Sequence, residues 1–507
     1  GVKSAGEGNS GFYVRGGSAD QKLVQLDEAP VYNASHLLGF FSVFNSDAIK
    51  DVKLYKGAMP AQFGGRLSSI IDIRMKDGNS KNFQASGGLG LISSRLTLEG
   101  PLKKGSKSSF IVSARRTYAD MFLAFSKDPE INDNTLYFYD LNLKANFEIN
   151  AKNRIFLSGY FGRDVLKFGG SFGMDWGNAT GTLRWNHIFN NKLFLNTTLI
   201  YSSFDYGFSI DSGVQNFDWN SNLKDMQAKW DFDYFLNPKH TLTFGMGHIL
   251  HTFSPAKITP GSDDSIFKAF ALESSKALES SFYINDEFVV NDKLSLSYGL
   301  RYSMFQNVGE GTEQIYEEGK PYTEENVIGT KTYKKGDFRN LYHGLEPRFA
   351  AKLTVNPQSS FKTSYNRTRQ YVQVASNNTA SLPFDRWISS NKFIEPQLSD
   401  MFSVGYFRNF KDNVFESSLE LYYKTMDNQV DVKTGGDILL GQHVEQVLLA
   451  GKGWSYGMEF MIKKNIGATT GWLSYTLAKT QRKIPGISEG NAYSPRYDRR
   501  HDLSLVL

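Results

Sequence analysis

The sequence predicts an all-β transmembrane barrel, and three observations support that prediction. From about Lys81 onward, apolar and polar residues alternate with a period of two. The alternating segments are roughly 10 to 14 residues long, whereas strands of globular proteins average about 5 to 6. The connections between the segments are alternately short and long. Together these features favour strands that cross a membrane, each with one apolar and one polar face.

The alternation is clearest in "KLSLSYGLRYSMF", residues 293–305. Leu296, Tyr298 and Leu300 fall on one face of this segment, and Ser297 and Arg301 fall on the other. Successive side chains of a strand point to opposite sides of the sheet. We therefore expect the three apolar residues to face lipid and the two polar residues to face the lumen.

Strand length separates a membrane barrel from a soluble β protein. The segment from Tyr137 to Phe147 covers roughly 33 Å at about 3.3 Å per residue, or about 25 Å of height when it is tilted by about 40°. Its aromatic residues lie toward both ends, as in the girdles of membrane proteins. A soluble sandwich or propeller would need shorter strands at closer spacing.

The connections predict which end of the barrel faces the periplasm. Short turns such as "NPKH" (Asn237 to His240) and "NDK" (Asn291 to Lys293) alternate with long segments such as 307–344 and 372–397, a pattern typical of periplasmic turns and extracellular loops. Because lipid tolerates no open sheet edge, we expect the strands to close into a barrel. About 22 strands are expected, a size whose lumen is wide enough to hold a separate domain. The abrupt first and last residues, "GVKSAGEGNS" and "HDLSLVL", indicate that both ends of the chain are missing. About 18 strands begin in the sequence, near residues 82, 93, 108, 136, 153, 176, 191, 223, 239, 279, 293, 345, 358, 398, 412, 453, 468 and 499.

Residues 1–80 differ in character from the rest. They contain short strands and many glycines, with one short helix expected near Ser46 to Lys50, so an α+β domain is predicted. The stretches "FYVRGGSADQKLVQLDEAPVY" and "DAIKDVKLYKGAMPAQFGGRLSSIIDIRMKDG" resemble the plug domain of TonB-dependent outer-membrane receptors. The stretch "YNASHLLGFFSVFN" is similar to receptors of Bacteroidota-type bacteria. The residues that match the plug pattern in order and spacing are Val14, Arg15, Gly16, Asp27, Ile49, Val52, Lys56, Gly57, Phe63, Gly64, Ile71 and Ile73.

The resemblance implies a plug domain at residues 1–80 inside a barrel formed by residues 81–507, in the outer membrane of a Gram-negative cell. It implies energy-coupled uptake of a scarce solute, driven by TonB and its inner-membrane motor through a segment not present in this chain. The ligand would be a small molecule, a peptide or a glycan, and a surface lipoprotein or larger outer-membrane complex is a further candidate partner. The alternative is a receptor-like barrel that serves as a scaffold in a surface-protein or secretion assembly. A passive porin is a third reading, which the plug argues against.

Three charged residues are candidates for a latch between plug and barrel. Arg15 and Arg66 lie in the plug. Glu459, the best candidate partner for these arginines, lies on the lumen-facing side of a late strand by the alternation. In the functional interpretation, the arginines pair with inward carboxylates and hold the plug until it is pulled. In the alternative, each is a solvated charge.

Aromatic residues supply the candidates for ligand contact. Tyr32, His36, Phe40 and Phe41 lie in the stretch from Tyr32 to Asn45, which would form an apical plug loop. An exposed stretch with so many rings would point to binding, whereas rings packed within the plug would not. Trp387, Phe384 and Phe393 share one long loop and could stack on a ligand or simply pack in the loop.

The sequence gives little sign of an enzyme, a cofactor site or a nucleic-acid site. It contains no H-E-x-x-H and no P-loop, so we expect no enzyme activity and no cofactor. The absence of Cys excludes disulfides and thiolate metal ligands. His248 and His251 should point to opposite faces of one strand, so no shared metal is expected. A net charge of +5, with scattered Lys and Arg, does not favour a nucleic-acid partner.

Overall fold

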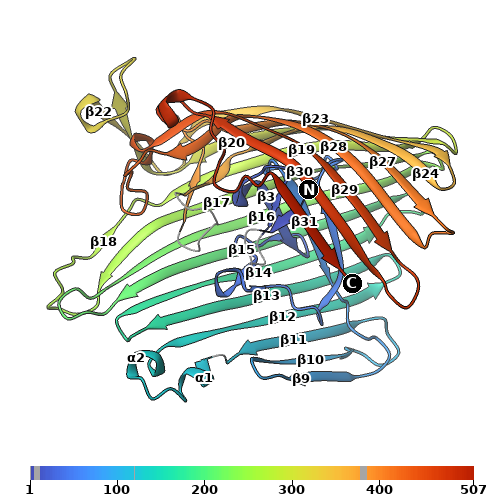
Figure 1. Cartoon of the computed structure of the whole chain (residues 1–507), viewed down its shortest axis with the longest axis horizontal. Coiled ribbons are helices and arrows are strands. Elements are labelled where there is room, and N and C mark those ends of the chain that lie inside the picture. The colour runs from blue at the N-terminus through green and yellow to red at the C-terminus, as the bar shows by residue number, and fades with distance from the viewer. Residues whose placement is uncertain (1, 5–11, 119, 377–384) are drawn as a thin grey trace.

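The computed structural model of the chain describes residues 2–4, 12–118, 120–376 and 385–507. A large antiparallel sheet curves into a barrel, which we call the wall, and a smaller body of strands, which we call the plug, lies inside it (Figure 1). The predicted all-β barrel with an internal plug is therefore confirmed. Within the described ranges, no helix is long and apolar enough to span a membrane.

Within the described residues, the wall consists of 19 strands that pair in chain order. The short strand β18 pairs only with the end of β17, so that β17 also pairs directly with β19. The strands are β9 (Gln84–Leu89), β10 (Ser93–Pro101), β11 (Ser109–Thr117), β12 (Thr135–Asn150), β13 (Asn153–Phe168), β14 (Phe172–Ile188), β15 (Leu193–Ile210), β16 (Phe217–Asn237), β17 (His240–Pro260), β18 (Phe270–Ala271), β19 (Ser275–Val289), β20 (Leu294–Val308), β23 (Phe338–Asn356), β24 (Ser359–Gln370), β27 (Gln397–Phe410), β28 (Phe415–Val432), β29 (Leu448–Lys464), β30 (Gly471–Lys483) and β31 (His501–Val506).

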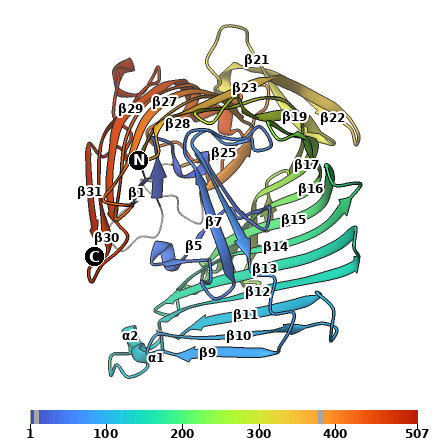
Figure 2. The same ribbon diagram turned by 90° about the vertical axis from the view of Figure 1, so that its right-hand side faces the viewer.

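Antiparallel pairing throughout the wall fixes the end at which each connection lies. Successive connections alternate between the two ends, so the turns between β16 and β17 and between β19 and β20 share one end. The same end receives residues 76–83, which lead from the plug into β9. This is the predicted arrangement, with short turns at the periplasmic end. Among the described ladders none joins β9 to β31, and Figure 2 shows these two strands at separate margins of the wall.

Several strands extend further toward the long-loop end than the sequence predicts. β16 begins at Phe217 instead of near residue 223, and β23 begins at Phe338 instead of near residue 345. Beyond the apolar band of a membrane barrel, neither face of a strand meets lipid. Apolar and polar residues need not alternate there, although the backbone ladder continues.

The two faces of the wall are as predicted for β20. Tyr298 and Leu300 are exposed on the outer surface, whereas Arg301 is buried against the plug and Ser297 borders a cavity that plug residues 54–58 also line. A soluble protein would bury the apolar face. The reversed pattern is the one required when lipid covers the outside.

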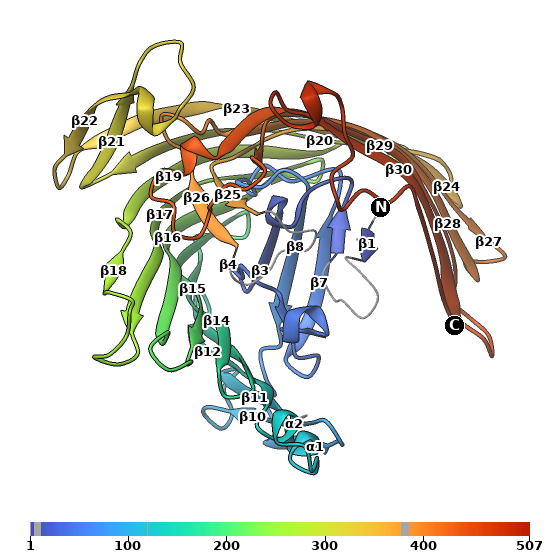
Figure 3. The same cartoon turned by 60° about the vertical axis from the view of Figure 1, so that its left-hand side comes forward.

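The plug is built on a four-stranded sheet in the order β4, β3, β8, β7, which stands in the lumen (Figure 3). Its strands are β3 (Lys22–Leu26), β4 (Ala29–Pro30), β7 (Ile49–Tyr55) and β8 (Ser69–Met75), and β3 pairs with β8 in parallel. Two small ladders accompany the sheet: β1 (Val2–Ser4) with β2 (Phe12–Val14), and β5 (Ser35–His36) with β6 (Phe41–Ser42). Only the 3-10 turns Ala19–Gln21 and Leu37–Gly39 are helical among the described plug residues.

The short helix predicted near Ser46 to Lys50 was wrong. This segment is a turn that leads into β7, because Asn45 caps it by accepting hydrogen bonds from the amides of Asp47 and Ala48. An asparagine that bonds the backbone locally favours such a turn over a helix.

The long connections carry most of the remaining ordered elements. They contain α1 (Asp120–Leu123), α2 (Pro129–Asn132), the hairpin of β21 (Gly311–Tyr316) and β22 (Val327–Tyr333), and the hairpin of β25 (Val372–Ala375) and β26 (Arg386–Ser389). The β25–β26 hairpin lies over the plug, where Tyr371 and Trp387 join a cluster of buried wall aromatics. The long-loop end of the lumen is therefore lined with rings.

Candidate functional site

Arg15 reaches the wall because the turn after β2 approaches it closely. Arg15 and Gly16 both have left-handed backbone conformations, with φ of 45° and 68°. A Cβ on Gly16 would overlap the side chains of Ser455 and Thr480 on the wall. Only glycine can adopt this conformation at such a short distance from β29 and β30. The turn therefore directs the Arg15 side chain into the wall.

Arg15 forms the centre of a four-residue ion-pair cluster. Its Nε donates to Glu459 Oε1 at 2.9 Å, and its Nη2 donates to Glu420 Oε2 at 2.9 Å. Lys56, which follows β7, lies 2.8 Å from Glu420 and 2.6 Å from Glu459. Arg15 is only 2% exposed and Glu459 only 5%, so the contact between these two is shielded from water, whereas Lys56 and Glu420 are partly exposed. Two plug cations thus meet two wall carboxylates.

The two wall carboxylates need the plug cations. Glu420 on β28 and Glu459 on β29 are direct cross-strand neighbours. Like charges opposite each other destabilise a sheet, and burial strengthens the repulsion. Burial alone would lower the pKa of Arg15, but Glu459 and Glu420 raise it, so the guanidinium stays charged. Removing the plug would leave two unpaired carboxylates on the wall.

The structure brings Arg15 and Glu459 together, but it does not place Arg66 with them. Within the described contacts, Arg66 does not meet Glu459; its Nη1 donates to the carbonyls of Gly65, at 2.8 Å, and Val372, at 3.2 Å. Its guanidinium also lies 5.7 Å from the Trp387 ring. The predicted Arg66–Glu459 contact was therefore wrong, because the turn at Gly65 directs Arg66 toward the start of β25 instead.

Lys56 and Glu420 were missed as latch residues, although the sequence held a signal for each. Lys56 belongs to the plug pattern, and Glu420 shares the polar face of "SSLELYYKTM" with Ser418 and Lys424. What the sequence could not give is the register that sets Glu420 opposite Glu459.

A second charged contact holds the plug on another part of the wall. Glu28, in the turn between β3 and β4, accepts hydrogen bonds of 3.1 Å from Arg74 of β8, Arg184 of β14 and Lys229 of β16. Burial would raise the pKa of Glu28, but these three cations hold it far below its usual range. Two plug cations thus bind carboxylates on β28 and β29, and a plug carboxylate binds cations on β14 and β16.

His36 is an anchor to the wall and is not an exposed ligand contact. It is 1% exposed, and its Nδ1 lies 2.7 Å from Asp164 Oδ2, while its Nε2 lies 3.5 Å from Asp140 Oδ2. Its ring stacks on Phe138 with centroids 4.0 Å apart. The next amide, of Leu37, donates to Asp164. Burial lowers the pKa of His36, but its hydrogen bonds to the two aspartates outweigh this and raise it.

The other predicted ligand contacts divide into packed and exposed rings. Tyr32 donates a hydrogen bond to Asp225 and meets the Trp387 ring edge-on at 4.8 Å. Phe41 packs on Phe138 at 5.4 Å. Phe40 is 69% exposed and presents its ring to the surroundings. Two more rings were predicted in the long loop that contains Trp387. Phe384 lies outside the described residues, and Phe393 packs on Tyr316 and Tyr322.

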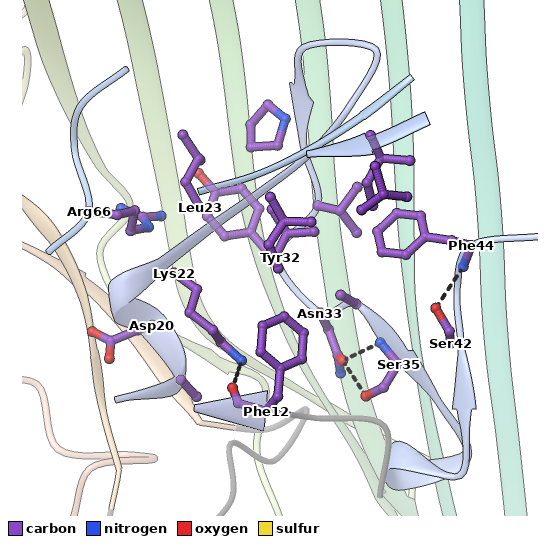
Figure 4. Close-up of a pocket in the computed structure, with 18 of the residues that line it drawn as sticks. Phe12, Asp20, Lys22, Leu23, Tyr32, Asn33, Ser35, Ser42, Phe44 and Arg66 are labelled. Atoms are coloured by element: carbon purple, nitrogen blue, oxygen red, sulfur yellow. Dashed lines mark hydrogen bonds between the residues drawn. The ribbon is translucent and has the colours of Figure 1, made fainter. Parts of the chain in front are cut away.

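One face of the plug sheet borders a cavity of about 530 Å³ (Figure 4). This volume lies within the range of small-molecule sites. Its floor is apolar, whereas Asp20, Lys22, Asn33 and Arg66 bring polar groups to it. Lys22 donates to the carbonyl of Phe12, and burial lowers the pKa of Lys22 to about 8. The apolar floor is formed by Val24, Val52, Leu54, Ile71 and Ile73.

In the part of the chain that the structure describes, no group of three or more His, Asp or Glu side chains could hold a metal ion. His251 is buried beside Asp225, whereas His248 is half-buried between Trp230 and Phe282 on the other face of β17.

Comparisons with known families and sequences identify both parts of the chain. The family model described as "TonB dependent receptor-like, beta-barrel" matches residues 113–503, which is more than half of the chain. The model described as "TonB-dependent Receptor Plug Domain" matches residues 1–69. No curated protein sequence matches the chain.

Solved structures share the fold at low sequence identity. The FrpB iron transporter of Neisseria meningitidis (F3-3 variant) is 15% identical, with a TM-score of 0.67 over 96% of this chain and 76% of that chain. The alcaligin outer-membrane receptor FauA of Bordetella pertussis is 15% identical, with a TM-score of 0.62 over 97% and 76%. The ferric-catecholate import receptor Fiu of E. coli K12 is 15% identical, with a TM-score of 0.66 over 100% and 80%. At this identity the likeness concerns the fold.

Proposed function

This chain belongs to the TonB-dependent receptor family, and we propose from that premise that it imports a scarce solute across the outer membrane by moving its plug. It is an outer-membrane β-barrel, and proteins of its family act as receptors and transporters and not as enzymes. TonB is the partner that the family implies. The plug occupies the lumen, so a solute can pass only if part of the plug moves.

The contact between Arg15, Lys56, Glu420 and Glu459 is the observation that supports this proposal most directly. Its hydrogen bonds are charge-assisted and therefore strong, yet they are few and local. A pulling partner can break such an interface one contact at a time, without opening the hydrogen-bonded wall. We propose that this cluster is a latch that keeps the plug seated at rest.

The domain division also belongs to this proposal. We place the plug at residues 1–80 and the wall at residues 81–507. β8 ends at Met75 and β9 begins at Gln84, so the boundary falls in the connection at the short-turn end. A tether there lets the plug move while it stays attached to the barrel.

An iron complex is the first solute to test. The solved structures of similar fold include an iron transporter, an alcaligin receptor and a ferric-catecholate receptor. A peptide or glycan is the next candidate, and a surface lipoprotein is a candidate partner for capture. Phe40, which is exposed, and the cavity beside Tyr32 and Arg66 are candidate contact points.

The test compares binding and uptake of radiolabelled ferric siderophores in cells that express the full-length receptor, with and without TonB. We expect surface binding in both strains and uptake only in the strain with TonB. Uptake at full rate without TonB would contradict energy-coupled import. Binding without uptake in either strain would favour a scaffold that captures ligand for other proteins.

A further inference from the structure

We infer that the paired strands β25 and β26, which we call the strap, tie the plug to the wall at the long-loop end, and that the plug moves only after a solute has lifted this strap. The inference rests on the proposed import function and goes one step beyond it. It makes the movement of the plug depend on a part of the wall that a solute meets from outside the cell.

The strap belongs to the wall, because both of its ends are anchored there. β25 follows β24 after a single residue, Tyr371. At the other end, Tyr206 of β15 donates a hydrogen bond to the Asp385 carbonyl at 2.9 Å, and Asn307 of β20 donates to the Ser390 carbonyl at 3.1 Å. The strap therefore stays with the wall when the plug moves.

The strap first binds the plug at Asp20, in the 3-10 turn after β2. Asp20 Oδ2 accepts hydrogen bonds from the Val374 amide of β25, at 3.1 Å, and from Gln370 Nε2 at the end of β24, at 3.0 Å. A carboxylate acceptor makes such bonds stronger than those between neutral groups. Asp20 follows Arg15 by five residues, so the strap and the latch hold the same short segment of the plug.

The second contact between strap and plug surrounds Trp387 of β26. The Trp387 ring lies 4.8 Å from the Tyr32 ring and 5.7 Å from the Arg66 guanidinium. Arg66 Nη1 also donates to the Val372 carbonyl of β25 at 3.2 Å. Because the strap lies at the long-loop end, a pull toward the periplasmic end draws the plug away from it. Such a pull stretches the contacts at Tyr32, Arg66 and Asp20 together.

Buried polar groups of the strap that lack partners point to a second position for it. Gln373 Nε2 and Arg386 Nε have no hydrogen-bond partner among the described residues, although Gln373 is 0% and Arg386 7% exposed. A buried polar group that makes no hydrogen bond costs free energy. Lifting the strap lets these groups reach water, which offsets part of the contacts that are lost with the plug.

A solute that enters from the long-loop end reaches the strap where it binds Asp20. A cavity of about 730 Å³ is lined by Val374 and Ala375 of the strap, by Asp20 of the plug and by Asp431 and Arg482 of the wall. The β28–β29 and β30–β31 connections, both at the long-loop end, complete its lining. A solute that donates hydrogen bonds, such as one with several hydroxyl groups, can replace the Val374 amide on the Asp20 carboxylate. That exchange releases the first contact of the strap.

The experiment removes the strap and keeps the wall strands that carry it. The Ser390 amide donates to the Tyr371 carbonyl at 2.7 Å, so the two ends of the strap lie side by side. Replacement of residues 372–389 by Gly-Gly therefore joins them through a two-residue turn. Asp20→Asn combined with Trp387→Ala is the second variant should the strapless chain not assemble, because it weakens both contacts and leaves the backbone intact.

The matched control shortens another connection at the same end of the barrel. It replaces residues 310–336 by Gly-Gly, since the Gly309 amide donates to the Asp337 carbonyl at 2.9 Å. This connection carries the β21–β22 hairpin. Among the described contacts, it forms no hydrogen bond or ion pair with the plug and bonds other long connections instead.

The probe is vancomycin, an antibiotic too large to cross an intact outer membrane at an effective rate. Cells express the full-length receptor in a defined salts medium, with or without TonB, and heat-resistant migration on gels verifies that each variant folds. We expect the strapless and double variants to lower the inhibitory concentration of vancomycin several-fold, only in the strain with TonB, because TonB then pulls a plug that is held less firmly. The intact receptor and the control should leave it unchanged in both strains.

Equal resistance of all folded variants would overturn the inference, because the strap would then not hold the plug. Sensitivity of strapless cells that lack TonB would also overturn it, since the strap itself would then seal the lumen. TonB-dependent sensitivity of the control would show that shortening any long connection has this effect, and the strap would lose its role. Energy-coupled import is decided separately, by the uptake of ferric siderophores with and without TonB.

Discussion

Both latch cations of the plug reach two wall carboxylates, and Glu459 is the more buried of the two, so its removal should loosen the plug. The change Glu459→Gln keeps the shape of the side chain but leaves Arg15 and Lys56 with only Glu420. We expect the plug to lose about 3 kcal/mol of docking free energy, at the lower end of the range for breaking a buried ion pair, because one partner remains. The measurement is the urea concentration at which trypsin begins to cleave the plug of the receptor in detergent.

The control for this prediction is Glu416→Gln on the neighbouring strand β28. Glu416 accepts a hydrogen bond from Asn465 in the adjacent short turn, outside the latch. It should leave plug cleavage unchanged. Equal behaviour of the two variants would show that the effect arises from loss of wall charge and not from the latch.

His36 should make plug docking depend on pH. It faces Asp140 and Asp164, with Arg115 bonded to Asp140 and Tyr160 nearby, and the aspartates raise its pKa above the ordinary value of about 6.5. A group whose pKa is raised in the docked state stabilises that state fully below its ordinary pKa. The stabilisation is lost as pH rises through the raised pKa.

We therefore expect the plug to be released at lower urea concentration as pH rises above about 6.5. The same trypsin assay, run across pH in one buffer system, measures this. His36→Gln should flatten the dependence, since its amide can still bond one aspartate but does not titrate. A slope that is the same in both proteins would place the titrating group elsewhere.

The sequence predicted Arg15 and Glu459 because each belongs to a local pattern, but the partners of His36 were not predictable in this way. Asp140 and Asp164 lie on different strands, and they meet His36 only through the seating of the plug in the lumen. Alternation can state which way a wall residue points, yet it carries no information on the depth at which a plug loop meets it. For the same reason Arg66 was assigned to Glu459 although it binds the carbonyl of Val372.

At the scale of the strands, alternation determined the wall almost completely. Each of the predicted strand starts corresponds to a wall strand, and the largest errors, at β16 and β23, lie at the long-loop end. Lipid imposes the alternating pattern only within the apolar band, so the sequence signal ends there although the ladder continues. The short strand β18 lies in this same region and left no signal in the sequence.

Leu300 tests the assignment of the lipid face. It is exposed on the outside of β20, and a count of about 10 membrane residues from the short turn before Leu294 places it near the bilayer midplane. Leu300→Arg should therefore cost about 2–4 kcal/mol, and Leu294→Arg, near the interface, about 0–1 kcal/mol. Reversible urea unfolding in lipid vesicles measures both. Equal costs at the two positions would contradict the placement of β20 in the membrane.

At the scale of the whole molecule, plug and wall are stabilised by different interactions, and this difference predicts what deletion of the plug does. The wall satisfies its backbone through ladders between neighbouring strands, whether or not the lumen is filled. The plug meets it mainly through side-chain contacts such as those of Arg15, Glu28 and His36, each hydrogen bond contributing about 0.5–1.5 kcal/mol net, or about 1.5–3 kcal/mol where a charge takes part. Deletion of residues 1–80 from the full-length receptor should therefore leave a folded barrel without a plug in its lumen. We expect large, steady KCl conductance in planar bilayers for the deletion variant and almost none for the intact receptor, with the same heat-resistant migration on gels.

A deletion variant that folds but stays closed would show that the long-loop hairpins, and not the plug, seal the lumen. A variant that fails to fold would show that the wall depends on the plug cations that neutralise Glu420 and Glu459. Adding Glu420→Gln and Glu459→Gln to the deletion should then restore folding and reveal the conductance.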